Sequence, residues 1–328
     1  MNRPLAAKSK GIVVLLGMLA LPAALPAQAQ SWPNRPVRLI VSSTPGTGGD
    51  ILARLVGERM SQALGQPIVV DNRPGAGGNI GAEMVTKSVP DGYTLLLTNA
   101  ALPITQATIA RPPFDVQKDF EHVAVLGTSQ FVLVVSTEVP VHSVQELIAY
   151  ARPRPNKMSF ASVGLGSPIY LGLELFRSMT GTQFLHVPYK GSTPALADIA
   201  AGRIDLMFTT YSSAKSFIDS NKVRLLAAGG SARMQSKPDV PTVHEAGVRG
   251  FAVDGWFGVA SAAKTPEAIV NRIAQEIQAV LNQAEVREKL VTLGFDLAYE
   301  GPKELRQRIE REVLMWTKLV KELGLKPE

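Results

Sequence analysis

The sequence has 328 residues and a formal charge of +6, is 45% hydrophobic and 6% aromatic, and contains no cysteine. Because residues 1–29 hold three basic and no acidic residues, the remainder carries +3, scattered without a basic tract, which argues against a nucleic acid partner. Without disulfides the fold must rely on its hydrophobic core, and about 300 residues suffice for two domains.

Residues 1–29 have the pattern of a cleaved signal peptide. Arg3, Lys8 and Lys10 form a basic start, residues 11–25 form an apolar segment, and Ala27-Gln28-Ala29 supplies a small-x-small cleavage site. The apolar segment is short and interrupted by proline, which disfavours the alternative of a retained membrane anchor. No cysteine follows the cleavage site, so we expect export to the periplasm without a lipid anchor.

Residues 38–63 predict a buried strand, a glycine-rich turn and an amphipathic helix. The apolar run at the start is typical of a parallel strand covered on both faces. Gly46, Gly48 and Gly49 allow a ligand to approach the backbone closely, and Asp50 is a suitable helix N-cap. The N–H groups at this helix start can bind an anion, although a purely structural turn fits the pattern equally well.

From residue 32 onward, strand and helix patterns alternate, which predicts βαβ units and an α/β fold. The expected strands are 37–42, 67–71, 94–98, 122–126, 131–136, 158–162, 184–188, 204–209, 223–228 and 256–260. The clearest helical patterns are 50–63, 78–88, 143–152, 168–179, 193–201 and 212–220, followed by two long amphipathic helices at 266–282 and 303–323.

These strands are too many for one small sheet, so we expect two lobes. Breaks that contain glycine and serine divide the chain into a discontinuous first lobe, 32–126 and 230–328, and an inserted second lobe, 127–229. Gly127 and the Gly229-Gly230 pair are hinge candidates. The ligand cleft should lie between the lobes, at the carboxyl ends of the strands.

Several loops that follow strands also begin helices. Residues 72–79 fit a tight turn for helix packing, whereas Thr98 and Asn99 follow another strand. Residues 162–168 combine glycine, a hydroxyl and a helix start in the second lobe. A helix start in each lobe can hold an acid from opposite sides through backbone N–H groups, without arginine.

No enzyme signature is present in the sequence. There is no P-loop, the Rossmann pattern at Gly46 and Gly48 lacks its third glycine, and Ser167 lies one place too late for a nucleophile elbow. The four histidines lack metal-ligand spacing. The sequence therefore predicts a binding protein without cofactor or metal, with an α/β hydrolase or transferase as the least favoured alternative.

Ordered sequence blocks lie along the chain at residues 31–36, 44–54, 72–79, 90–95, 186–191, 194–196, 239–242 and 256–258. Together these blocks resemble the Bug family, the TctC-like extracytoplasmic substrate-binding proteins of tripartite tricarboxylate transporters. The resemblance implies a type II periplasmic binding fold, with each lobe a mostly parallel sheet flanked by helices. It also implies that the lobes close around a small carboxylate held by backbone amides, hydroxyls and bridging waters.

Carried over by position, the resemblance implies a set of ligand-binding residues: Thr44, Gly46, Gly48, Gly49, Asp50, Thr98 and Asn99 in the first lobe, and Gly164, Gly166, Ser167 and Thr209 in the second. Three places depart from the family pattern. Leu165 and Tyr170 replace polar side chains, Thr209-Thr210-Tyr211 stands where Asp and Asn are frequent, and Gln130-Phe131 where Pro-Asn is common. These departures favour an aromatic or aliphatic carboxylate over citrate or a polar amino acid.

The expected function is capture of a carboxylate in the periplasm and its delivery to a tripartite tricarboxylate transporter permease. The alternative is a ligand-loaded co-receptor for a sensor kinase. Helices 266–282 and 303–323 show ordinary amphipathic faces, so a monomer is expected. We expect the carboxylate to sit on the backbone amides of 44–50 and 164–167 with no essential basic side chain, and Lys190 is the cation that would contradict this.

The exported protein should begin at or near Gln30. Mass spectrometry of protein recovered from the periplasm measures this directly, because removal of residues 1–29 changes the mass by a known amount. A mature mass that still contains residues 1–29 would exclude cleavage at this site.

Overall fold

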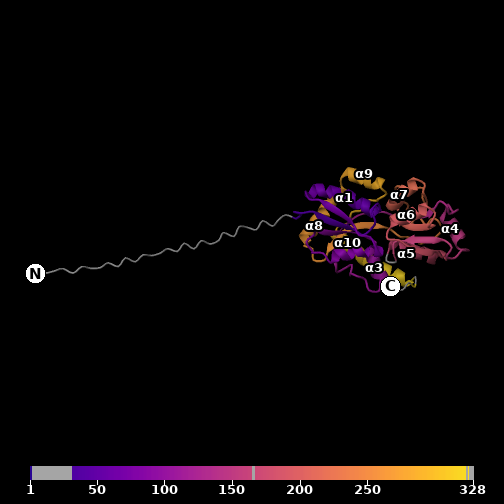
Figure 1. The fold of residues 1–328 in the computed structure, drawn as a ribbon, viewed down its shortest axis with the longest axis horizontal. Helices are drawn as coiled ribbons and strands as arrows, with labels where there is room; N and C mark the ends of the chain where they lie inside the picture. The colour runs from indigo at the N-terminus through magenta and orange to yellow at the C-terminus, as the bar shows by residue number, and fades with distance from the viewer. Residues whose placement is uncertain (2–31, 165–166, 323, 325–328) are drawn as a thin grey trace. The chain divides into compact units, whose positions relative to one another are not determined.

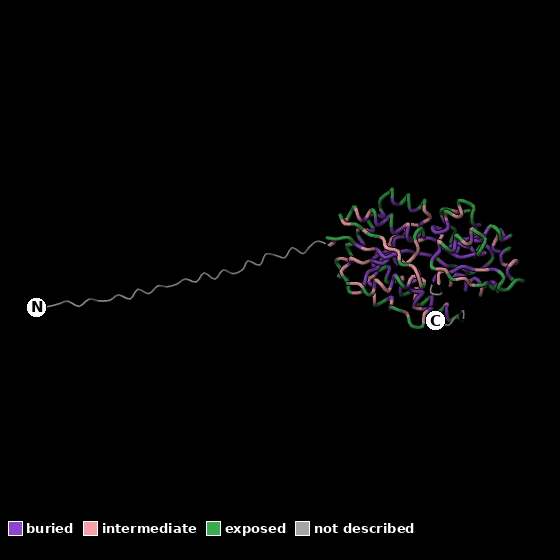
Figure 2. The backbone as a smooth tube through the Cα atoms, in the orientation of Figure 1, coloured by how far each residue is buried: buried purple, intermediate pink, exposed green. Residues whose placement is uncertain are grey.

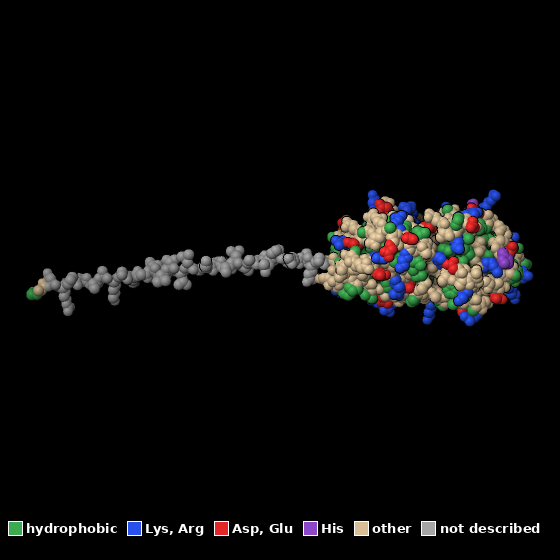
Figure 3. All heavy atoms as spheres, turned by 90° about the horizontal axis from the view of Figure 1, so that it is seen from above, with side chains coloured by type: hydrophobic (Ala, Val, Ile, Leu, Met, Phe, Trp, Pro, Cys, Tyr) green, Lys and Arg blue, Asp and Glu red, His purple; other side chains and the backbone are tan. Residues whose placement is uncertain are grey.

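The computed structural model describes residues 1, 32–164, 167–322 and 324. The expected signal peptide, apart from Met1, lies outside these residues. Within the described ranges, no helix is both long enough and apolar enough to traverse a bilayer. On the face that Figure 3 shows, acidic and basic side chains are intermixed, in keeping with the scattered charge of the sequence.

The first lobe is built on a five-stranded sheet with the order β2-β1-β3-β10-β4. Its strands are β1 (Val37–Val41), β2 (Ile68–Asn72), β3 (Thr94–Asn99), β4 (Phe120–Thr128) and β10 (Trp256–Ala262). Its helices are α1 (Gly48–Leu64), η1 (Ala76–Gly78), α2 (Asn79–Thr86), α3 (Ala101–Thr108), α8 (Glu267–Leu281), α9 (Ala284–Thr292) and α10 (Pro302–Glu322). Neither α3 nor α9 is among the helices expected from the sequence.

The second lobe is built on another five-stranded sheet, with the order β7-β6-β8-β5-β9. Its strands are β5 (Phe131–Ser136), β6 (Ser159–Ser162), β7 (Leu185–Pro188), β8 (Leu206–Thr210) and β9 (Val223–Ala228). Its helices are α4 (Val144–Ala151), α5 (Pro168–Thr180), α6 (Ser192–Ala200) and α7 (Tyr211–Asp219). Figure 1 shows these four helices gathered around the second sheet.

In each sheet one strand runs against the others. β10 pairs antiparallel with β3 and β4, and β5 pairs antiparallel with β8 and β9, while the remaining ladders are parallel. Both reversed strands directly follow a crossing between the lobes. The expected two-lobed α/β fold with mostly parallel sheets is confirmed.

The two crossings lie against each other. Ser129 N–H donates to Gly255 O at 3.0 Å, and Gly229 N–H donates to Phe131 O at 2.6 Å. Gly127 lies inside β4, where it pairs with Phe257 of β10. The exact lobe boundaries and the hinge positions stay predictions.

Buried residues gather in the interior of each lobe (Figure 2). Val37, Leu39 and Val41 belong to a cluster on one face of the first sheet, while Ile40 belongs to a cluster on the other face. Successive strand residues point to opposite faces, so an unbroken apolar run indicates a strand buried on both sides. The expectation for this strand is confirmed.

His122 is a buried histidine in β4, 1% exposed. Its Nε2 lies 3.0 Å from Val116 O, whereas no hydrogen-bond partner of its Nδ1 is found in the described part of the chain. Burial lowers the pKa of His122 to about 4, because the protonated ring would carry a second N–H without an acceptor.

Acid should therefore destabilise the protein. Below pH ~6.5 the unfolded chain binds a proton at this ring while the folded chain does not until pH ~4, so the free energy of unfolding should fall across this window by up to about 3 kcal/mol. Urea unfolding between pH 7.5 and 4.5 measures the slope. His122→Gln should flatten it and His142→Gln, at an exposed position, should not; equal slopes in both variants would contradict the assignment.

Candidate functional site

A pocket lies between the two lobes and encloses about 730 Å³ of empty space, part of it open to solvent. It is lined by the loops after β1, β2 and β3 of the first lobe and after β6, β7 and β8 of the second. Parallel strands end at the same edge of a sheet, and the reversed strands β5 and β10 begin at that edge. Phe131, Trp256 and Phe257, at the starts of these two strands, therefore also line the pocket.

The lobes contribute equivalent elements to the pocket. By strand order, β3 of the first lobe corresponds to β8 of the second, and β10 corresponds to β5. Asn99 at the end of β3 pairs with Phe257, and Thr210 at the end of β8 pairs with Phe131. Each lobe thus places a polar side chain beside a phenyl ring at the pocket edge.

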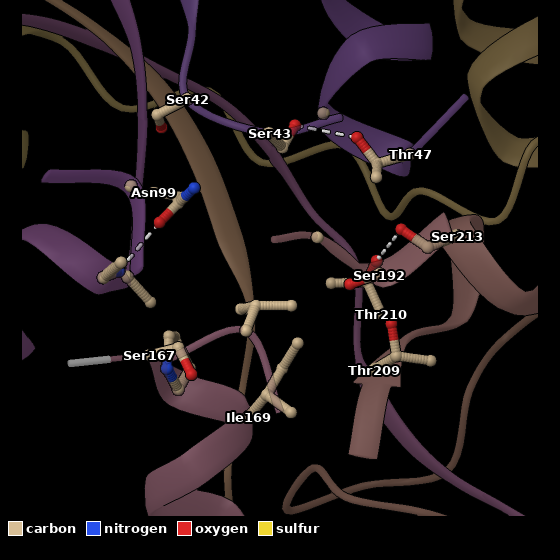
Figure 4. Close-up of a pocket in the computed structure, with 18 of the residues that line it drawn as sticks. Ser42, Ser43, Thr47, Asn99, Ser167, Ile169, Ser192, Thr209, Thr210 and Ser213 are labelled. Carbon is tan, nitrogen blue, oxygen red and sulfur yellow. Dashed lines mark hydrogen bonds between the residues drawn. The ribbon is translucent and has the colours of Figure 1, made fainter. Parts of the chain in front are cut away.

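The polar lining consists mostly of hydroxyl groups (Figure 4). They come from Ser42, Ser43, Thr47, Ser167, Ser192, Thr209, Thr210 and Ser213, with Asn99 as the amide. Lys190 is the sole ionisable residue among the described lining residues, and no carboxylate lies with it. Such a surface offers many neutral donors and one positive charge, which suits an anion.

The pocket also has an apolar wall. Val163, Ile169, Phe131, Trp256 and Phe257 supply aliphatic and aromatic surface. Such a wall favours a ligand that carries hydrocarbon as well as charge.

The indole of Trp256 in this wall is fixed by α10. Its N–H donates to Glu312 Oε2 at 3.0 Å. Burial raises the pKa of the Glu312 carboxyl, although the hydrogen bond from Trp256 and the charge of Arg308 act in the opposite direction. The C-terminal helix thus contributes to the pocket indirectly, by orienting one of its rings.

Asp50 supports the first loop rather than lining the pocket. Thr47 is the N-cap of α1 and accepts from Asp50 N–H at 3.4 Å, so the expectation that Asp50 caps this helix is wrong. The Asp50 carboxylate instead accepts from Gly46 N–H at 2.9 Å and from Arg54 and Asn72. Although burial alone would raise it, these hydrogen bonds lower the pKa of Asp50. Its role in this structure is to hold the turn in shape.

The expected binding residues of the first loop separate into two groups. Gly49 lines the pocket. Thr44 and Gly48 lie outside the lining and contact the second lobe, where Gly48 N–H donates to Ser213 Oγ at 2.9 Å. Gly46, with a φ of 78°, also lies outside the lining.

Thr98 and Asn99 end β3 side by side, and both line a small hollow next to the main pocket. Asn99 lines the main pocket, and its Oδ1 accepts from Ala101 N–H at the start of α3, at 2.8 Å. Thr98, 1% exposed, does not line the main pocket. Its Oγ1 is buried without a hydrogen-bond partner in the described ranges.

In the second lobe, Ser167 and Thr209 line the pocket. Ser167 is the N-cap of α5 and accepts from Tyr170 N–H at 3.2 Å. Gly164, with a φ of 115°, lies outside the lining, and a Cβ there would be 3.0 Å from Gly77 N of the first lobe. Gly166 lies outside the described residues.

The loop after β2 has a larger part in the pocket than the sequence indicated. Gly75, Gly77 and Gly78 line the pocket, so this loop does more than serve helix packing. Its place follows from topology, because β2 runs parallel to β1 and ends at the same sheet edge. Gly191, Ser192 and Ser213 were missed as well, since only the fold brings them to the pocket, whereas Lys190 had been singled out from the sequence. The described part of the chain holds no group of three or more His, Cys, Asp or Glu side chains arranged for a metal ion.

Comparison with known proteins finds that residues 52–325 match the family model described as tripartite tricarboxylate transporter family receptor, TctC. The chain is 36% identical to the UPF0065 protein in the tcbD–tcbE intergenic region of Pseudomonas sp. strain P51, over 90% of this chain and 88% of that protein. It is 34% identical to BugT of Bordetella pertussis, over 92% of this chain and 94% of BugT.

Solved structures agree with these relatives. R. palustris Rpa4515, solved with adipate, superposes with a TM-score of 0.87 at 36% identity, over 90% of this chain and 100% of that chain. MatC from Rhodopseudomonas palustris, with bound malate, gives a TM-score of 0.84 at 30% identity, over 88% of this chain and 100% of MatC. The resemblance noted from the sequence is confirmed.

Thr209→Val tests whether the Thr209 hydroxyl serves the fold. Thr209 is fully buried and no partner of its Oγ1 is found in the described residues, so removing the hydroxyl should leave the free energy of unfolding of the ligand-free protein unchanged or higher. Thr105→Val is the matched control, because the equally buried Thr105 donates to Asn79 Oδ1 at 2.8 Å. Loss of the Thr105 hydroxyl should lower the free energy of unfolding, measured with urea, by about 1–3 kcal/mol. Equal losses in both variants would show that Thr209 has a structural partner.

Proposed function

Because the chain belongs to the tripartite tricarboxylate transporter receptor family, TctC, we propose that it binds a small carboxylate in the pocket between its lobes and delivers it to the membrane permease of such a transporter. The family and the solved neighbours are substrate-binding proteins and not enzymes. Export to the periplasm through residues 1–29 is part of the proposal.

The composition of the pocket is the observation that carries the proposal. Both lobes line it with hydroxyls, one amide and one lysine, and no carboxylate lies among the described lining residues. An anion can enter such a site without meeting a like charge. The solved neighbours contain adipate and malate, both carboxylates.

The apolar wall of the pocket restricts the class of carboxylate that can bind. Phe131, Ile169, Trp256 and Phe257 give it aliphatic and aromatic surface. Burying hydrocarbon against such a surface is favourable by about 25 cal/mol per Å². The ligand is therefore an aliphatic or aromatic carboxylate rather than citrate or a polar amino acid.

Neutral groups hold the carboxylate in this proposal. Gly49 at the start of α1 and Ser167 at the start of α5 both line the pocket, so the positive ends of two helices approach it. Thr209 Oγ1, buried and unpartnered in the described residues, is a further donor. Gly48 is a poor test of this arrangement, because a Cβ there would lie 1.9 Å from Ser212 Oγ and would push the lobes apart.

Calorimetric titration tests both the ligand class and the neutral mechanism. Adipate or benzoate should bind more tightly than citrate. Thr209→Val should weaken the binding of adipate or benzoate at least tenfold, because a hydrogen bond to a charged group is worth about 1.5–3 kcal/mol. Lys190→Ala should weaken it less than about fivefold, as for a solvent-screened charge.

Each arm has an outcome that contradicts the proposal. Preferential binding of citrate would make the apolar wall irrelevant to the ligand class. Normal binding by Thr209→Val together with failure of Lys190→Ala would identify a charge-pair site. No binding of any of the three acids would remove the carboxylate proposal.

A further inference from the structure

The two lobes touch along a seam at the edge of the pocket, and two of its residues, Gly191 and Ser213, also line the pocket. We use this name for Thr44 and Gly48 of the first lobe together with Gly191, Thr193, Ser212 and Ser213 of the second. The seam is reciprocal, because each lobe presents a glycine that receives a hydroxyl side chain from the other lobe. All of these contacts are made between residues of the protein.

On one side of the seam, α1 meets α7. Gly48 N–H donates to Ser213 Oγ at 2.9 Å, and Ser213 Oγ lies 2.7 Å from Thr210 Oγ1 (Figure 4). A Cβ on Gly48 would lie 1.9 Å from Ser212 Oγ, so the α1 backbone and the α7 side chains are in direct contact. The first-turn N–H groups of a helix lack intrahelical acceptors, and here the second lobe supplies one.

On the other side, the start of α6 meets the loop after β1. A Cβ on Gly191 would lie 2.5 Å from Thr44 Oγ1. Thr193 Oγ1 donates to Pro45 O at 3.0 Å and lies 3.3 Å from Thr44 Oγ1. These contacts repeat the pattern of the α1–α7 side with the lobes exchanged.

We infer that Ser213 is a positioning residue that holds the lobes closed in the absence of ligand. Its hydroxyl oxygen takes the α1 amide that an anion would otherwise take at this helix start. The ligand then binds a protein whose closed form is already populated. Since apparent affinity scales with the fraction of protein in the binding-competent form, loss of the seam should weaken every ligand by the same factor.

The lobe separation can be measured without any ligand. The chain contains no cysteine, so Glu58→Cys on α1 and Lys222→Cys in the second lobe provide two unique sites for spin labels. Both positions are exposed and lie outside the pocket lining and the seam. Pulsed electron resonance on the doubly labelled full chain then reports the distribution of lobe–lobe distances.

The ligand-free labelled protein should show a main population at the separation of this structure. Ser213→Ala should shift that population to longer distances and raise the Kd for adipate about fivefold, which is about 1 kcal/mol. Ser216→Ala, one turn further along α7 and exposed, is the matched control and should change neither quantity. If Ser213→Ala does not fold, Thr193→Val removes the contacts on the other side of the seam and takes its place.

Two results would overturn the inference. One is a ligand-free protein with no population at the closed distance. The other is a Ser213→Ala distribution that superimposes on that of the unsubstituted labelled protein. Because the distance measurement contains no ligand, its result stands whether or not the proposed carboxylate function holds.

Discussion

The pocket exists because the strand that follows each lobe crossing runs antiparallel to the sheet that it joins. β5 and β10 therefore begin at the sheet edge where the parallel strands end. The hydrogen bonds of Ser129 with Gly255 and of Phe131 with Gly229 keep the two crossings together. The ligand-binding edges of the two sheets consequently face each other, and each lobe completes the site begun by the other.

Charged side chains have different roles in the pocket lining and around it. The ionisable groups near the pocket are mostly engaged with the protein itself: Asp50 shapes the first loop with Arg54, and Glu312 holds the indole of Trp256. The lining relies on hydroxyls and helix starts, which carry no net charge. A buried basic side chain without its anion would instead pay a large desolvation cost.

The fold could be predicted from the sequence because its signals are local. The apolar run of β1 and the alternation of strands and helices indicate the α/β class directly. The candidate site could be predicted only in part: Gly49, Asn99, Ser167 and Thr209 line the pocket, whereas Thr44 and Gly48 contact the opposite lobe. Whether a residue of the first loop lines the pocket or contacts the opposite lobe depends on how the two lobes pack together. No local sequence pattern around this loop contains that information.

The prediction that Asp50 caps α1 was wrong for a related reason. Thr47 and Asp50 are both good N-cap residues, and spacing alone does not choose between them. In the structure the Asp50 carboxylate is occupied by Arg54 and Asn72, and the latter comes from the end of a different strand. The choice of N-cap in α1 thus depends on Asn72, a residue distant in the sequence.

The reciprocal glycines of the seam, Gly48 and Gly191, matter for the closing of the lobes and not for the folding of either lobe. Neither Gly48 nor Gly191 has a left-handed φ, and each is crowded by side chains of the opposite lobe. A side chain gained at either position would meet that obstacle only when the lobes come together, and each lobe could still fold around its own sheet. Under genetic drift, such a change would leave an abundant, well-folded protein that no longer retains its cargo.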